Sequence, residues 1–441
     1  MFIETVGHAG IFLTDKENHP ILITDPWLVG STYWRSWWLQ NYPEQIKLEE
    51  IYKSESIYIT HEHPDHFHPP TLKKFSKNSN LIIPDLPNKE LENYLKNNKF
   101  KFDVIKKNYW KVINLKNNIS IFSIPLWNDD SILLINTPGA IIINLNDSKP
   151  PKLILKKLKK FIKNSNKKSI LLSSYSPASI VNSFRYNNEV LSIKSKNDYI
   201  IYLNNLCNIL ETDIFMPFAS QAIFYRNDSK WANEFKVTYE DLLSGWNTNK
   251  TKLIPCYSKI SLDDLNYTFI PEDKFITKNK YLIEKKIDEQ ISKELNYKFD
   301  NNDLNLLLKK INKISFFTKL FFRKGIGFKI DNKEYLYLNN NIVDISTENT
   351  LLKKNNDFLI EVPGLVLKDV LNTNHFGDLG ITMFTFIHSR KGLDPRLVYL
   401  FFILISLDDY GHIKSVSKAF KWLIKQIYNY SKFYFKPLKL P

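Results

Sequence analysis

The chain has 441 residues and a mass of 52.0 kDa, with 43% hydrophobic and 24% charged residues. These proportions are typical of globular proteins and argue against a disordered or fibrous chain, and the length predicts two domains. The 61 basic residues exceed the 46 acidic ones, but only six are Arg, and Lys is spread over the whole sequence. This diffuse charge of +15 argues against nucleic-acid binding and favours attraction of a small anionic substrate.

The longest apolar run, Leu397 to Leu407, is much shorter than the roughly 20 residues that cross a bilayer. It predicts a buried helix and no membrane span. The N-terminal sequence MFIETVGHAGIFL lacks the basic and apolar regions of a signal peptide. Only Cys207 and Cys256 occur, too few for a disulfide framework. We therefore expect a reduced, cytoplasmic protein.

The first half of the chain reads as strands separated by turns and helices. Short runs such as MFIETVG, GIFLTD, PILITDPWL and SIYITHEH are rich in β-branched residues, and the pattern resumes at ISIFSIP, SILLIN and AIIINLND. Helical patterns intervene over 69–76, 88–97, 151–164 and 199–210. This order favours an α/β fold with a sheet-on-sheet core flanked by helices. We predict that residues 1–250 form this domain.

After Trp246 the chain becomes polar and irregular, which predicts a linker with a helical connection over 251–300. Residues 301–441 then show strands at 327–330, 335–338 and 358–362, a helix at 365–371 and the apolar helix near Leu397. This smaller α+β unit, with IGFKIDNKEYLYL at its front, looks like a sterol-carrier-type domain. Its tail, Lys418 to Lys439, alternates Lys with aromatic residues and predicts an amphipathic helix packed against the body rather than a membrane anchor.

A dense group of metal-ligand residue types follows the apolar run SIYI. It reads Thr60-His61-Glu62-His63-Pro64-Asp65-His66 and contains three imidazoles and two carboxylates. Imidazole and carboxylate are the ligands that borderline transition metals prefer. His61 and His63 stand at alternate positions and can share one ion, while Asp65 and His66 can turn toward a second. The alternative is a solvated polar turn.

This string resembles the HxHxDH signature of the metallo-β-lactamase superfamily. The resemblance implies an αββα sandwich with a metal site at one sheet edge and Asp65 as a catalytic residue. It also implies a metal ligand at Asp147, after the run AIIINLN, and a supporting carboxylate at Asp25, which ends the run ILITD. The alternative for Asp147 is an ordinary turn residue before Pro150.

Several short stretches are further similar to the metallo-β-lactamase-like part of CMP-N-acetylneuraminate hydroxylases. They are Val6 to Gly10, Asp25 to Leu28, Trp37 to Leu39, and Pro70 to Lys74 behind the metal loop. The resemblance implies a hydroxylase-like oxidoreductase acting on a sugar or nucleotide-sugar of the CMP-sialic-acid type.

The chain departs from that pattern in two respects. Two distant Cys residues and no Cys-x-His pair cannot build a Rieske iron–sulfur cluster, so hydroxylation would need a separate electron-transfer protein. The family pattern also expects a ligand His near Leu126 or Trp127, and none is there. Asp129 or Asp130 is a substitute, or both are solvated turn residues.

We therefore expect one or two transition-metal ions, iron or zinc, held by His61, His63, Asp65, His66 and Asp147. Zinc would favour hydrolysis by an activated water that Asp65 orients, and iron would favour hydroxylation with dioxygen. A catalytically silent binding protein is the alternative of another class.

Residues near the N-terminus are candidates for supporting the site or contacting substrate. His8 lies in a Gly-flanked turn, and its alternative is a structural hydrogen-bonding role. For Trp34 and Trp37 the alternative is packing in the core. Arg35 can bind a phosphate or be a solvated surface residue.

Overall fold

The computed structural model describes the chain in segments. These are residues 1–84, 90–98, 100, 105–107, 111–126, 131–176, 184–186, 189–190, 195–276, 279–346, 356–390 and 392–435.

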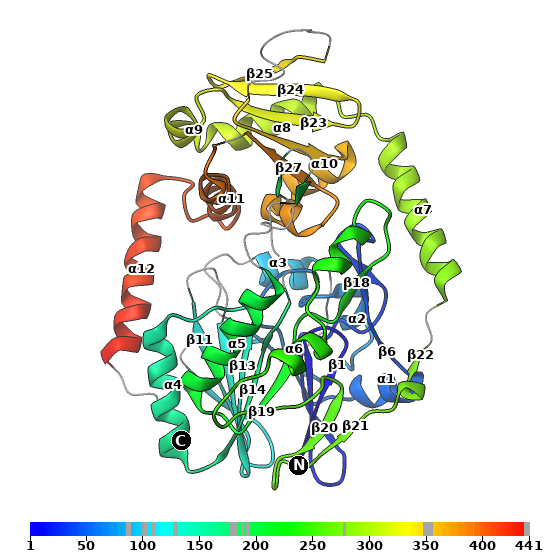
Figure 1. Cartoon of the computed structure of the whole chain (residues 1–441), viewed down its shortest axis with the longest axis vertical. Helices are drawn as coiled ribbons and strands as arrows, with labels where there is room; N and C mark the ends of the chain where they lie inside the picture. Colours follow the sequence, from blue (N-terminus) through cyan, green and yellow to red (C-terminus); the bar gives the residue numbers. More distant parts are fainter. Residues whose placement is uncertain are drawn as a thin grey trace.

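Two large sheets face each other in the N-terminal half (Figure 1). The first sheet has the order β21-β20-β1-β2-β3-β7-β8-β9. In chain order its strands are β1 (Phe2–Val6), β2 (Gly10–Thr14), β3 (Pro20–Thr24), β7 (Ser56–Tyr58), β8 (Asn80–Ile83), β9 (Ile105–Lys107), β20 (Ser258–Ser261) and β21 (Tyr267–Phe269). The second sheet has the order β10-β11-β12-β13-β14-β17-β19. Its strands are β10 (Val112–Asn114), β11 (Ser120–Pro125), β12 (Ser131–Asn136), β13 (Ala140–Asn146), β14 (Lys168–Ser174), β17 (Ile214–Phe218) and β19 (Lys252–Leu253).

Apolar side chains from both sheets meet between them. Ile3 and Ile11 of the first sheet share one buried cluster with Leu133, Ile142 and Ile170 of the second. Because helices cover the outer faces as well, strands such as β13 are apolar on both sides, which explains the continuous run AIIINLN. This interior holds the two sheets together.

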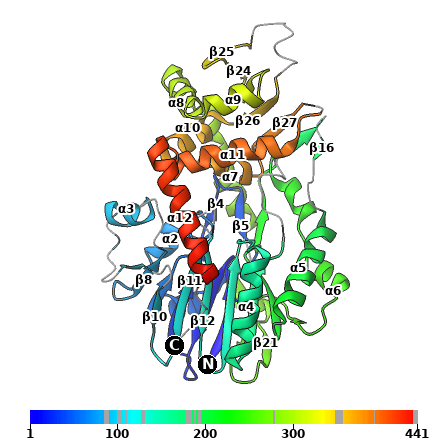
Figure 2. The same ribbon diagram turned by 90° about the vertical axis from the view of Figure 1, so that its left-hand side faces the viewer.

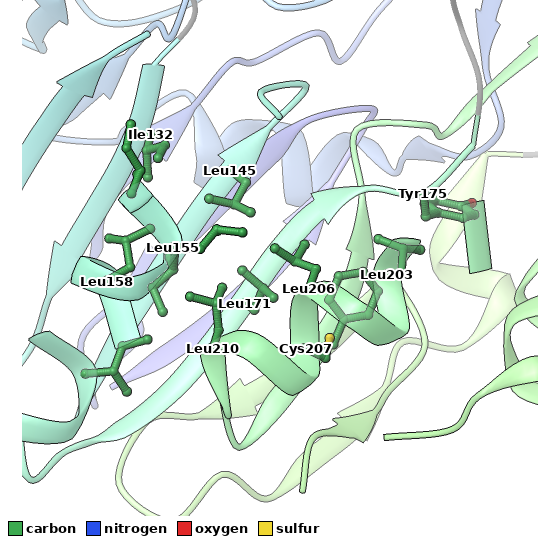
Figure 3. Close-up of a cluster of buried hydrophobic side chains, with 14 of the residues drawn as sticks. Ile132, Leu145, Leu155, Leu158, Leu171, Tyr175, Leu203, Leu206, Cys207 and Leu210 are labelled. Carbon is green, nitrogen blue, oxygen red and sulfur yellow. The ribbon is translucent and has the colours of Figure 1, made fainter. Parts of the chain in front are cut away.

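Helices cover both outer faces, so the predicted αββα sandwich is confirmed. On the second sheet, α4 (Lys152–Ser165), α5 (Lys196–Leu210) and α6 (Tyr239–Gly245) pack through one cluster that includes Leu155, Leu158, Leu203 and Leu206 (Figure 3). On the first sheet, α1 (Gln45–Ile51), α2 (Pro69–Leu72) and α3 (Glu90–Asn97) contribute Leu48, Leu72 and Leu91 to another cluster.

The C-terminal domain has a sheet of its own, with helices packed on it (Figure 1). Its strand order is β16-β15-β27-β26-β23-β24-β25. The strands are β15 (Phe184–Tyr186), β16 (Glu189–Val190), β23 (Ile326–Ile330), β24 (Lys333–Leu338), β25 (Asn341–Asp344), β26 (Phe358–Val362) and β27 (Phe386–Ser389). The helices are α8 (Asn301–Asn312), α9 (Ser315–Phe321), α10 (Gly364–Thr373) and α11 (Pro395–Asp409). The likeness of this unit to a sterol-carrier-type domain stays a prediction.

The domain boundaries depart from the predicted ones in two places. Residues 252–269, expected to be linker, form β19, β20 and β21 at the edges of the two sandwich sheets, and α7 (Lys280–Asn296) then leads to the C-terminal domain. β15, expected in the first domain, pairs in parallel with β27 of the C-terminal sheet. Edge strands of two to four residues carry no apolar run that distinguishes them from loop, and long-range pairing leaves no local pattern.

Residues from the segment 31–43, together with Arg226, form contacts with the C-terminal domain and with α7. In this segment β4 (Ser31–Thr32) and β5 (Trp37–Leu39) form a small sheet with β18 (Ala222–Phe224). β6 (Tyr42–Pro43) pairs with β22 (Phe275–Ile276). Trp34 donates its indole N–H to Asp369 of α10 over 2.9 Å. Buried Arg226 binds Glu294 of α7 through two hydrogen bonds of 2.9 Å each. These contacts place the C-terminal domain directly over the sandwich.

The apolar helix predicted near Leu397 is α11, and Phe401 and Ile405 on it are buried in the core of the C-terminal domain. Within the described residues, no helix is both long and apolar enough to cross a membrane. The amphipathic helix of the basic tail is α12 (Val416–Phe435). Among the side chains of α12 whose burial is described, Val416, Phe420, Leu423, Ile424 and Ile427 are exposed, which contradicts the prediction that they pack against the body.

Candidate metal centre

The metal loop lies at one edge of the sandwich, where several strands end. β3 and β7 run parallel, so Asp25 after β3 and the loop after β7 emerge at the same edge. Backbone hydrogen bonds from His66 and Phe67 to the carbonyl of His63 fold the loop into a tight turn. This turn brings side chains that are adjacent in sequence toward a common point. The four residues of the loop that we expect to bind metal are His61, His63, Asp65 and His66.

The buried carboxylate of Asp25 holds the metal loop in position through hydrogen bonds. It accepts hydrogen bonds from the Thr60 amide over 2.7 Å, the Thr60 hydroxyl over 2.6 Å and the Asn146 side-chain amide over 3.2 Å. Burial raises the pKa of Asp25, although hydrogen bonds from His66 and Thr60 oppose the shift. Asp25 is fully buried, so it supports the loop rather than facing the pocket.

The fully buried ring of His66 is held between carboxylates at both nitrogens. Its Nδ1 lies 3.2 Å from Asp25, so this nitrogen carries the proton and donates it. The lone pair of Nε2 then faces Asp147 at 3.2 Å and Asp65 at 3.3 Å. A lone pair and two carboxylates repel one another unless a cation, either a proton or a metal ion, lies between them. The geometry of His66 therefore fits a cation at this position.

The ligand atoms fall into two groups that share His66. One group is His8, Asp65 and His66, the other is His61, His66 and Asp147, and within each group the atoms lie within 4.8 Å of one another. All of these residues are buried except Asp147, whose side chain is 37% exposed. Because the single free lone pair of His66 can bind only one ion, the two groups provide a full donor set for one ion and leave the remaining donors for a second.

Asp65 is fixed by two residues from the N-terminal segment. Tyr33 donates its hydroxyl to one carboxylate oxygen over 2.6 Å, and His8 Nε2 lies 3.3 Å from the other. Burial alone would raise the pKa of Asp65, but the charge of His66 and hydrogen bonds from His66 and His8 hold it well below its ordinary value. Asp65 is therefore an ionised carboxylate at the bottom of the pocket.

His61 is oriented through Thr60, whose hydroxyl lies 3.1 Å from Nδ1 of the ring. Since that hydroxyl donates to Asp25, it accepts from His61 Nδ1 and leaves Nε2 with a lone pair. Nε2 points toward His63 Nδ1, 2.8 Å away. Burial and the charges of His66 and His63 hold the pKa of His61 well below its ordinary value, so the ring is neutral, as a metal ligand must be.

His66 has the opposite tendency. Burial alone would lower its pKa, but the charges of Asp65 and Asp147 and their hydrogen bonds hold it well above the ordinary value for histidine. The surroundings of this ring therefore favour positive charge. A bound metal cation would satisfy the same preference.

The three aromatic-segment candidates lie in different places. Trp37 lines the pocket and donates its indole N–H to the carbonyl of Ile381 over 2.9 Å. Trp34 contacts α10 in the other domain instead, and the guanidinium of Arg35 donates to Ser31 over 3.0 Å. Trp34 and Arg35 do not belong to the pocket lining.

A cavity of about 670 Å³ opens above the metal loop, with walls from both domains. Residues of the sandwich, including the metal loop, line it together with polar and apolar residues of the C-terminal domain. Lys149 adds a positive charge to the rim. Cavities of this size hold small organic ligands. Its lining includes the polar residues His8, His61, His63, Asp65, Asp147 and Asp378 and the large aromatic and aliphatic residues Tyr399, Phe402, Ile403 and Trp422.

Some pocket residues were not identified from the sequence. Asp378, buried in the 3-10 helix Phe376–Ile381, lies 3.9 Å from His63 and has a pKa raised by burial. No local signal marks it, because it lies in the other domain, far along the chain. Tyr33, which donates to Asp65, was not among the candidate site residues either. Asp129 and Asp130, considered above as substitutes for the missing His, lie outside the described residues, and of the two positions where that His was expected, Leu126 lines the pocket.

Comparisons with known proteins agree with the sequence resemblance over a short stretch. No protein-family model matches the chain. The chain is 42% identical over 67 residues to the cytidine monophosphate-N-acetylneuraminic acid hydroxylase of Asterias rubens, which covers 15% of this chain and 10% of that protein. The Xenopus laevis hydroxylase is 42% identical over 80 residues, covering 18% and 12%. The human protein, described as inactive, is 41% identical over 66 residues, covering 15% and 12%.

The matched stretch thus spans about a tenth of the length of these curated relatives. Similar solved structures include an isothiocyanate hydrolase from Delia radicum gut bacteria (13% identity, 59% of this chain and 98% of that chain, TM-score 0.40). CmlA, a diiron β-hydroxylase from Streptomyces venezuelae, matches at 16% identity over 49% and 44% of the chains, with a TM-score of 0.36. YhfI, a metallo-β-lactamase fold protein from Bacillus subtilis, matches at 8% identity over 57% and 96%, with a TM-score of 0.36.

The class of this protein follows from its own architecture. It is an αββα sandwich with an HxHxDH loop at the strand ends and a second domain that closes over that loop. The sequence resemblance to the metallo-β-lactamase superfamily implied this arrangement. The similarity to CMP-N-acetylneuraminic acid hydroxylases is confirmed over the short matched stretch.

Proposed function

We propose that the chain is a metal-dependent enzyme of the metallo-β-lactamase superfamily that holds one or two transition-metal ions. The observation that carries the proposal is the ring of His66, whose Nε2 faces Asp65 and Asp147 while Nδ1 is committed to Asp25. A metal ion is the natural cation for such a set of buried donors.

The donor set fits zinc and iron alike. His66 Nε2 has one lone pair and would bind one ion together with His61 and Asp147, and Asp65 and His8 would then remain as donors for a second ion. His63, whose Nδ1 faces His61 Nε2, is proposed to share the first ion. When bound, zinc would activate water for hydrolysis, and iron would activate dioxygen for hydroxylation.

Asp65 is proposed to orient the attacking group and accept its proton. Its carboxylate is ionised and held in one position by Tyr33 and His8. Across the cavity, Asp378 lies close to His63 and can donate or accept a hydrogen bond from a bound substrate. The closing C-terminal domain would exclude bulk water from this space.

The first candidate reaction is hydroxylation of a sugar or nucleotide-sugar, with electrons from a separate protein. The sequence similarity to CMP-N-acetylneuraminic acid hydroxylases supports it. The cavity offers Lys149 to an anionic group and the rings of Tyr33, Trp37 and Tyr399 to a base or sugar face. Hydrolysis by a metal-activated water is the second candidate, supported by the fixed, ionised Asp65 beside the proposed ions.

Metal content tests the site. The protein purified without added metal should contain a transition metal, and the variant His61→Ala/His66→Ala should lose most of it while remaining folded. His19→Ala is the matched control, because His19 belongs to an exposed His/Asp/Glu group on another turn. If the double variant kept its metal, the site assignment would be wrong. A wild-type protein without tightly held metal would instead support the catalytically silent binding protein.

The reaction is tested on the metal-loaded protein. Iron, together with CMP-N-acetylneuraminate-dependent dioxygen consumption in the presence of a reduced ferredoxin, would support hydroxylation. Zinc, together with turnover of chromogenic ester or phosphoester substrates, would support hydrolysis. Either activity should disappear in Asp65→Asn. Activity retained in that variant would exclude the proposed role of this carboxylate.

A further inference from the structure

The last described helix, α12, carries an apolar stripe that faces solvent. It extends from the C-terminal domain across the front of the sandwich (Figure 2). Phe420 is 63% exposed, Ile424 50% and Ile427 58%, and Val416 and Leu423 are exposed as well. These positions recur at three- and four-residue intervals, so their side chains lie along one face of the helix. Exposed apolar residues in a row are unusual and indicate a surface that binds something.

A different face of α12 packs on the protein. Trp422 stacks on His412, with the ring centres 5.4 Å apart, and Gln426 is buried. At 100° per residue, Trp422 and Gln426 point to a side well away from Phe420 and Ile427. The helix is therefore held in place by one face while its apolar stripe remains open.

Three lysines occupy the remaining face of the helix, between the open stripe and Trp422, and Lys421 lies beside the stripe. Lys418, Lys421 and Lys425 are all exposed. The sequence from Lys414 to its end contains seven Lys and no Asp or Glu. An apolar stripe bordered by Lys is the pattern of a helix that lies in a membrane interface, where apolar groups enter the acyl boundary and Lys meets lipid phosphates.

We propose that α12 docks this protein on a membrane surface that contains anionic lipids. The charge of the segment decides between occupants of the stripe. A second copy of the chain would bring one positive segment against another, which Coulomb repulsion disfavours. An anionic headgroup layer complements the Lys border and buries the apolar stripe at the same time.

Docking would place the membrane beside the cavity. Trp422 of α12 lines the cavity through the packed face of the helix, together with Tyr399 and Ile403 of α11. The proposal does not depend on the proposed enzymatic function, because it concerns the opposite face of α12.

Vesicle flotation of the full-length, metal-loaded protein tests the proposal. Binding is expected to phosphatidylcholine vesicles that contain phosphatidylglycerol, to be much weaker without it, and to fall as salt increases. Phe420→Glu/Ile427→Glu should weaken binding by about tenfold or more, because two apolar anchors are lost. Phe316→Glu on α9 is the matched control, since Phe316 is 81% exposed but lies on another helix.

Three results would overturn the proposal. They are wild-type protein that does not float with anionic vesicles, a double variant that floats as well as wild type, and equal loss of binding in Phe316→Glu. Sedimentation velocity without lipid tests whether a second copy of the chain covers the stripe instead. If wild type is a dimer and the double variant is a monomer, a second copy covers the stripe, and this result would also overturn the proposal. Far-UV circular dichroism and melting temperature establish that the variants are folded.

Discussion

Replacing Asp25 by Asn tests how the metal centre is held. The carboxylate receives four donors, two from Thr60 and one each from Asn146 and His66. An Asn side chain has one oxygen, and if that oxygen serves the three donors at Oδ2, its NH₂ group faces the amide N–H of Thr60. One charge-assisted hydrogen bond is lost and two donors oppose each other. The free energy of unfolding should fall by about 2–4 kcal/mol.

The same substitution should weaken metal binding, because the Asp25 carboxylate fixes the orientation of His66 and the tautomer that leaves Nε2 free for a ligand. Loss of such a partner typically lowers metal affinity by about 10- to 100-fold, or about 1.4–2.8 kcal/mol. Competition with a chromogenic chelator measures the affinity. Urea unfolding in the presence of a chelator measures the stability of the metal-free protein.

Asp213→Asn is the matched control for this experiment. Asp213 also accepts two hydrogen bonds of 2.9 Å, from the amide and hydroxyl of Ser169. It precedes β17, while Asp147 follows β13, and β13, β14 and β17 are parallel, so Asp213 lies at the opposite edge of the sheet. This variant should lose stability but keep its metal affinity. If Asp25→Asn kept its metal affinity within about twofold, the orienting role of Asp25 would be refuted.

Other substitutions probe the surroundings of the site and the domain contact. Tyr33→Phe removes the hydroxyl donor of Asp65 and should lower the free energy of unfolding by about 1–3 kcal/mol in urea titrations, and an unchanged value would contradict a stabilising bond. Arg226→Met leaves Glu294 buried without its cation and should cost about 3–5 kcal/mol in the same assay, much of which the double variant with Glu294→Leu should recover. In the C-terminal sheet, a hydrogen bond from the imidazole of His388 and the charge of Lys329 lower the pKa of Glu361 to about 2. Because this pKa is depressed on folding, its stabilisation is present above about pH 4.5 and is lost as the pH falls toward about 2. Because solvent screens this partly exposed group, we expect it to contribute about 1 kcal/mol to the free energy of unfolding. Glu361→Gln should make the free energy of unfolding depend less on pH over that range. Parallel pH curves for wild type and variant would contradict this contribution of Glu361.

The metal loop was predictable because its information is local. His61, His63, Asp65 and His66 stand within six residues, directly after a buried strand. Strand ends of a parallel pair meet at one edge, so a carboxylate such as Asp25 at the end of another apolar run is expected beside the loop. Period and spacing are enough to place these groups.

The rest of the pocket depends on contacts between distant parts of the chain. Asp378 reaches the site only because the second domain is docked over it, and Tyr33 reaches Asp65 because its segment has positive backbone φ angles over Tyr33, Trp34 and Arg35. Such left-handed turns of bulky residues are rare and are stabilised by tertiary contacts rather than by local preference. Trp34 was therefore a candidate for contacting substrate, with core packing as the alternative, whereas its indole contacts the neighbouring domain.

The charges of the molecule explain how one pocket can serve both a metal cation and an anionic substrate. Asp25, Asp65 and Asp147 surround one imidazole at the bottom of the cavity, and this concentration of negative charge favours a bound cation. Once a divalent ion neutralises that charge, the pocket no longer repels an anion, and Lys149 and the formal charge of +15 attract it. Removing the metal should thus weaken binding of an anionic substrate analogue far more than binding of a neutral one, as isothermal titration with metal-free and metal-loaded protein would show. Equal losses for the two ligands would mean that the metal shapes the pocket and does not balance its charge.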